Sequence, residues 1–292
     1  MRRNMREALC VVLLLTVCAG ATAQTVKPKV PAGIDPGGLG IALITHGVDY
    51  TKPAVAARLA RDGEGDLVGA DLVDGTQRPF AANNALDDIL VALAPGRVIP
   101  MRVGEGRQLG SFEPGLVFLK QTATRVVVLP RALRSKADWA PFVTAAKAWP
   151  SMLFLMAADD IRDAPGQRCE TTAQLNGDDM PPSALGLANV MVVASLSSQS
   201  LPCIAASYAW SKPDAIVAPA SALREAPGHA NASPRDAGEA AMLAAGLIPR
   251  YAKELGVATS AADAKRILLS KATKLKGLDV PVLECCDRPA PR

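Results

Sequence analysis

The chain has 292 residues, of which 49% are hydrophobic and 21% charged, and its formal net charge is +4. This length and apolar content are sufficient for one large domain with its own core. So small a charge gives no indication of a nucleic-acid partner or a membrane surface, and we expect neither.

Residues 1–23 have the pattern of a secretory signal peptide. Three arginines precede an apolar run at residues 8–20, and Ala21, Thr22 and Ala23 give the small-x-small pattern of a cleavage site. The apolar run is short for a membrane span, so we expect cleavage before Gln24 rather than an uncleaved anchor. The mature chain would then have no membrane span and would lie in the periplasm or outside the cell.

Four cysteines remain after cleavage, namely Cys169, Cys203, Cys285 and Cys286. An even number in an oxidising compartment predicts disulfides, for which three connectivities exist. Because Cys285 and Cys286 are adjacent, we expect one to pair with Cys169 and the other with Cys203. A metal is the weaker interpretation, since the spacing lacks a second close Cys or His pair.

A Pro- and Gly-rich segment at residues 24–39 predicts an irregular N-terminal arm. Short apolar runs then alternate with helical patterns. The predicted strands are residues 41–44, 67–70, 98–103, 126–129, 152–157, 190–193 and 215–217. The predicted helices are residues 53–61, 85–93, 114–121, 136–148, 234–255 and 261–273, with Asn83 or Asn84 capping the second.

The predicted strands are continuous aliphatic runs rather than alternating ones. Strands with that pattern are buried on both faces, as in a parallel sheet with helices on each side. No repeat or change in composition marks a second domain, and the polar stretch at residues 159–184 predicts a surface excursion. We therefore expect one α/β domain over residues 40–292, a three-layer α/β/α sandwich with a mostly parallel central sheet.

Six stretches follow one another in the order and spacing of known motifs. Residues 93–103 (LAPGRVIPMRV) match V-A-P-x-A-x-I-x-P-V-R-V, and residues 228–241 (GHANASPRDAGEAA) match G-T-S-x-A-A-P-x-V-A-G-x-A-A. The others are residues 41–50, 68–75, 183–194 and 213–219. In this, the chain resembles the subtilisin-like serine proteases, or subtilases, from about residue 40 to about residue 274. The resemblance implies the subtilase fold.

The same resemblance implies that the catalytic residues are missing. In subtilases an Asp orients a His, which takes a proton from the attacking Ser. The matching positions here are Thr45, Ala82 and Ala230, and Asp160 stands where an Asn would donate a hydrogen bond to the oxyanion. An ionised Asp160 accepts hydrogen bonds and donates none. Pro130, at the strand that would pair with substrate, has no N–H to offer.

Two alternatives start from the two histidines of the chain, which lie next to the lost positions. His46 and His229 could serve relocated catalytic residues in an active serine-type endopeptidase or hydrolase. With Asp159 and Asp160 they could also form a mixed metal site in a metal-binding envelope protein. We favour an exported pseudoprotease without catalytic residues, metal or cofactor, which binds a peptide or protein.

Overall fold

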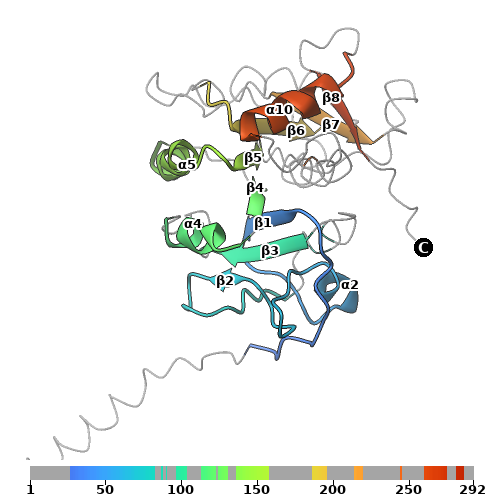
Figure 1. Cartoon of the computed structure of the whole chain (residues 1–292), viewed down its shortest axis with the longest axis vertical. Helices are drawn as coiled ribbons and strands as arrows, with labels where there is room; N and C mark the ends of the chain where they lie inside the picture. Colours follow the sequence, from blue (N-terminus) through green and yellow to red (C-terminus); the bar gives the residue numbers. More distant parts are fainter. Residues whose placement is uncertain are drawn as a thin grey trace, which may run out of the picture.

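A computed structural model gives the fold of the chain (Figure 1). It describes residues 27–82, 87, 90, 97–103, 113–122, 124–130, 136–157, 186–195, 214–219, 244, 260–274 and 281–285. The strands in these ranges are β1 (Gly40–Thr45), β2 (Ala70–Asp71), β3 (Arg97–Arg102), β4 (Thr124–Leu129), β5 (Leu153–Ala157), β6 (Val190–Ser195), β7 (Ala215–Pro219) and β8 (Val282–Cys285). The helices are α2 (Pro53–Ala56), α4 (Glu113–Lys120), α5 (Lys136–Ala148) and α10 (Ala261–Ser270).

The described strands form one eight-stranded sheet in the order β2-β3-β1-β4-β5-β6-β7-β8, and each neighbouring pair is parallel (Figure 1). The chain steps from β1 out to β2 and β3, and then returns past β1 to β4 and β5. Crossovers between parallel strands are right-handed, so connections that run in opposite directions lie on opposite faces of the sheet. This rule places α2 on one face and α4 and α5, which contact each other, on the other. The predicted α/β fold class is confirmed.

The core lies where the aliphatic runs predicted it. All six residues of β1 and all five of β5 are buried, and Phe142 of α5 packs edge-on against Phe154 of β5 at 5.5 Å between ring centroids. Burying one Ile, Leu or Phe side chain contributes about 1.5–3 kcal/mol. Residues buried on both faces of the sheet explain why the runs do not alternate.

The last described helix is fixed at both its cap and its flank. Ser260 caps α10 by accepting a hydrogen bond from the Asp263 amide at 3.1 Å. From the helix, the Lys265 Nζ reaches Asp214 Oδ1 at 2.7 Å and donates to the Val190 carbonyl at 2.5 Å. These contacts tie α10 to the beginnings of β6 and β7.

Two predicted elements differ from the structure, and one observed strand was not predicted. The helix predicted at residues 53–61 ends at Ala56, because Leu59 and Arg61 make bridges to Val98 and Leu67 instead. For the same reason the strand predicted at residues 67–70 is replaced by the short β2. No strand was predicted at residues 282–285, where β8 pairs with β7.

The bounds of the other predicted helices and strands agree with the observed bounds to within a few residues, wherever the structure describes those residues. The helix predicted at residues 136–148 is α5. The arm has no regular secondary structure over residues 27–39, as predicted. Most of the helices predicted at residues 85–93 and 234–255 lies outside the described residues. No helix in the described part of the chain is long and apolar enough to cross a membrane.

Candidate functional site

The strand order places a topological switch point at the carboxyl ends of β1 and β4, and we call this edge of the sheet the crevice. The connection after β1 leaves toward β3, whereas the connection after β4 leaves toward β5. Ligands of open parallel sheets bind where neighbouring connections separate in this way. Leu43 of β1 pairs with Val128 of β4. Two residues further along each strand, Thr45 and Pro130 therefore lie at the same edge of the sheet.

The turn after β1 has a fixed geometry. Thr45 is buried and its Oγ1 donates to the Gly47 carbonyl at 3.4 Å, whereas the neighbouring His46 is exposed. Gly47 has a φ of 123°, and a Cβ there would lie 2.6 Å from the Phe80 carbonyl carbon. Only glycine fits both the conformation and the space. Thr45 therefore presents a hydroxyl where the resemblance implies an acid.

The second predicted position lies beside this turn. The Val48 amide donates to the Pro79 carbonyl at 2.9 Å, and the Ala81 amide donates to the Val48 carbonyl at 3.3 Å. These bonds form a parallel bridge between Val48 and Phe80. Ala82, which is exposed, follows directly. The structure thus brings the segments of Thr45 and Ala82 together. Thr45 contributes a hydroxyl group there, and Ala82 contributes a methyl group.

A buried carboxylate fixes these two segments to each other. Asp87, which is 1% exposed, accepts a hydrogen bond from the Asp49 amide at 3.2 Å and pairs with Lys52 Nζ at 3.0 Å. Asp49 in turn accepts from the Thr51 amide at 3.2 Å and the Thr51 hydroxyl at 2.5 Å. Sequence reasoning missed the role of Asp87, because nothing local connects it with a lysine 35 positions earlier.

The arm supports the same region from outside. The Tyr50 hydroxyl donates to the Pro28 carbonyl at 3.1 Å, and the Tyr50 ring packs against Phe80 at 5.0 Å between centroids. Burial raises the pKa of Tyr50, opposed by Arg78, so the phenol stays a neutral donor. Through Tyr50 and Phe80, the position of the arm is linked to the turn that holds Thr45.

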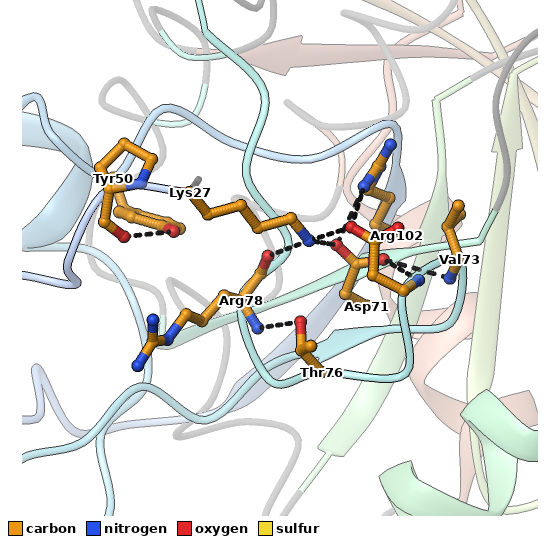
Figure 2. Close-up of polar contacts among 9 residues, drawn as sticks. Lys27, Tyr50, Asp71, Val73, Thr76, Arg78 and Arg102 are labelled. Carbon is orange, nitrogen blue, oxygen red and sulfur yellow. Dashed lines mark hydrogen bonds and ion pairs between the residues drawn. The ribbon is translucent and has the colours of Figure 1, made fainter. Parts of the chain in front are cut away.

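One end of the arm is held by a group of four charges (Figure 2). Lys27 Nζ contacts the buried Asp71 carboxylate, lies 2.5 Å from Asp74 Oδ2 and donates to the Arg78 carbonyl at 3.0 Å. Arg102, the last residue of β3, bonds Asp71 and Asp74 at 3.1 and 3.0 Å. The hydrogen bond from Lys27 lowers the pKa of Asp74. Two cations and two carboxylates balance, so the group carries no net charge.

Four of the predicted site residues lie outside the described residues, namely Asp159, Asp160, His229 and Ala230. The same holds for Cys169, Cys203 and Cys286, so the expected disulfides stay predictions. Within the described ranges no three His, Cys, Asp or Glu side chains are grouped as a metal site would require.

Comparison with known proteins gives likeness in structure only. No family model and no curated protein matches the sequence. The chain is similar to the crystal structure of a cold adapted subtilisin-like serine proteinase, with 16% identity and a TM-score of 0.55 over 90% of this chain and 94% of that one. It is also similar to a lanthipeptide protease, with 16% identity and a TM-score of 0.52 over 81% and 80%. At these identities the likeness shows the fold alone, and the fold is that of the subtilisin-like proteases.

Proposed function

We propose that this chain is an exported subtilase-fold pseudoprotease that binds a peptide or protein and does not cleave it. The observation that carries the proposal is the bridge between Val48 and Phe80, which places Thr45 and Ala82 in adjoining segments at the end of β1. A hydroxyl hydrogen-bonded to a carbonyl cannot hold an imidazolium, and a methyl group cannot accept a proton.

The size of the expected loss supports an inactive site. In subtilisin, removing the three catalytic side chains lowers turnover by about 10⁶-fold. The resemblance also puts Ala230 at the nucleophile and Asp160 at the oxyanion donor, and loss of one such donor costs about 2.7–4 kcal/mol. Together these changes leave no route for acyl transfer through the original positions.

Binding in the crevice would rely on side chains more than on strand pairing. Pro130 follows β4 at the crevice and has no N–H, so it cannot donate to an extended peptide there. We expect the ligand to be a peptide or a protein segment held by shape and by side-chain contacts.

Export is proposed from the first 23 residues. Their basic head, apolar run and small-x-small end fit a cleaved signal peptide, followed by the arm at residues 24–39 and the domain at residues 40–292. The periplasm or the extracellular space is therefore the proposed location.

A binding assay with fluorescein-labelled casein tests the proposal. The purified chain should bind this probe saturably and leave it intact on a gel. Ala82→Trp, which places a bulky ring at an exposed position beside the turn of Thr45, should weaken binding at least about tenfold, or about 1.4 kcal/mol. Ala32→Trp, at an exposed position of the arm, is the matched control and should bind normally. Casein fragments, or equal binding by Ala82→Trp, would contradict the proposal.

A further inference from the structure

Lys27 of the arm reaches the segment that contains Phe80. Its Nζ donates to the Arg78 carbonyl at 3.0 Å, as Figure 2 shows, and the same carbonyl accepts the Phe80 amide hydrogen at 2.8 Å. The lysine is held there by Asp71 and Asp74, and the Asp71 carboxylate has no exposed surface. An ion pair shielded from water in this way is screened by salt less than an exposed one. Lys27 therefore attaches the arm firmly to the Arg78 carbonyl.

Pro28, the next residue of the arm, contacts the other segment of the bridge. Its carbonyl accepts a hydrogen bond from the Tyr50 hydroxyl at 3.1 Å, and Tyr50 is fully buried. The Tyr50 amide donates to the Val48 carbonyl at 3.1 Å, and that carbonyl also accepts from the Ala81 amide at 3.3 Å. A buried hydroxyl without an acceptor is unfavourable, so Tyr50 favours the docked position of Pro28.

These contacts close a circuit around the bridge between Val48 and Phe80. The circuit runs from the arm to Phe80, crosses the bridge to Val48 and returns to the arm through Tyr50. Hydrogen bonds joined in a network support one another. Thr45 closely precedes Val48 in the sequence, and Ala82 closely follows Phe80. The circuit therefore lies beside the edge of the sheet at which the ligand is proposed to bind.

Removing Lys27 should affect this circuit without unfolding the domain. The buried Asp71 carboxylate keeps its pair with Arg102 at 3.1 Å and still accepts the amide hydrogens of Val73 and Asp74, both at 3.1 Å. Its charge stays compensated, so the loop after β2 should keep its conformation. A change at the bridge then reports the loss of the arm contact itself.

We propose that Lys27 and Pro28 form a clamp that holds the bridge between Val48 and Phe80 in the arrangement that binds the ligand. Lys27 and Tyr50 are positioning residues, because they act through the bridge rather than by contact with the ligand. Docking of the arm and binding of the ligand favour each other, since both require the same bridge. The ligand part of this inference rests on the proposed function, whereas the clamp is measurable without a ligand.

Hydrogen exchange of the full chain without ligand tests the clamp. The Val48 and Ala81 amides both donate within the bridge and report its opening. Lys27→Met should accelerate exchange of these amides at least about fivefold, as should Tyr50→Phe, which keeps the ring and loses only the hydroxyl. Lys29→Met, at an exposed position of the same arm, should leave both rates unchanged. Unchanged rates in Lys27→Met would overturn the proposal.

A second control separates positioning from a general loss of stability. Asn189 is buried, and its side chain donates to the carbonyls of Ala146, Trp149 and Met152. Asn189→Ala should therefore lower the unfolding midpoint of the domain. It should leave ligand binding unchanged, because none of these contacts involves the bridge.

Binding of fluorescein-labelled casein gives the functional measurement. Lys27→Met and Tyr50→Phe should each weaken binding at least about fivefold, whereas Lys29→Met and Asn189→Ala should bind as the unmodified chain does. Faster exchange with unchanged affinity, or equal weakening by Asn189→Ala, would overturn the proposal. Failure of the unmodified chain to bind casein would contradict the proposed function instead, and the exchange rates would still decide whether the clamp exists.

Discussion

The carboxylate of Asp87 accepts the amide hydrogen of Asp49 at 3.2 Å, and this bond joins the two segments that border the crevice. The resemblance to subtilases implies that an Asp and a His would link these segments in an active enzyme. Here the described link is made by Asp87, Lys52 and main-chain bonds around Val48. The frame of the site is therefore held by contacts that need no catalytic side chain.

Replacing Asp87 tests how much this link stabilises the domain. Asp87→Ala leaves the Asp49 amide without its buried acceptor and should lower the free energy of unfolding by about 2–4 kcal/mol. Lys52→Met should also destabilise the domain, by about 1–3 kcal/mol, because it leaves the buried Asp87 carboxylate without its cation. Urea unfolding of both variants measures these losses, and an unchanged midpoint for either variant would contradict the assignment.

Gly47 should be far less replaceable than a glycine in open surroundings. Gly47→Ala would place a Cβ 2.6–2.8 Å from the main chain of Phe80 and Ala81, at a φ of 123°. We expect a loss of more than about 2 kcal/mol. Gly63 has nothing within 4 Å of its Cβ position, so Gly63→Ala should be neutral or slightly stabilising. A Gly47→Ala protein with an unchanged urea midpoint would show that the turn is not constrained as described.

Lys27 should control whether the arm stays docked. Lys27→Met removes the cation that contacts Asp71 and Asp74, although Arg102 still pairs with both (Figure 2). A loss of about 1–2 kcal/mol should raise the rate of proteolytic cutting within the arm by about 5–30-fold. Lys29→Met, at an exposed position on the same arm, is the control and should be cut at the original rate.

The docking of the arm should weaken in acid. Burial alone would raise the pKa of Asp35, but hydrogen bonds from Arg61, Arg97 and Gly37 outweigh it, so the pKa of Asp35 is lowered. The hydrogen bond from Lys27 likewise lowers the pKa of Asp74. Groups with a lowered pKa in the folded state stabilise it above their unfolded pKa and lose that contribution as the pH falls through the folded value.

The unfolded value for both groups is 3.8, so the loss should begin near about pH 5 and grow below pH 4. Asp35→Asn should reduce the pH dependence of proteolytic cutting in the arm. Glu64→Gln, in the exposed 62–66 turn, should leave it unchanged. An arm equally resistant at pH 7 and pH 3 would refute this account.

Much of the sheet could be predicted because its strands are continuous aliphatic runs. β1, β5 and residues 126–129 of β4 are apolar or small residues typical of strands buried on both faces, and α5 was predicted with its observed bounds. The failures have a common cause in long-range pairing. Leu59 and Arg61 pair with Val98 and Leu67, which no local helical pattern could reveal.

The site was predictable only in part. The Val48–Phe80 bridge shows that the segments of Thr45 and Ala82 adjoin, whereas the assignment of these two residues to catalytic positions stays a prediction. Thr45 is buried and the adjacent His46 is exposed, as expected for neighbouring side chains of an extended chain, which point to opposite faces. The roles of Asp87 and Lys27 depend on partners distant in sequence, and short motifs contain no information about them.

Labelling with a fluorophosphonate probe tests the central claim most directly. The purified chain is incubated with the probe and with casein, and the protein mass and casein fragments are measured. An inert crevice predicts no mass increase and no fragments. Stoichiometric labelling, with casein cleavage that the probe blocks and that His46→Ala or His229→Ala removes, would show an active hydrolase.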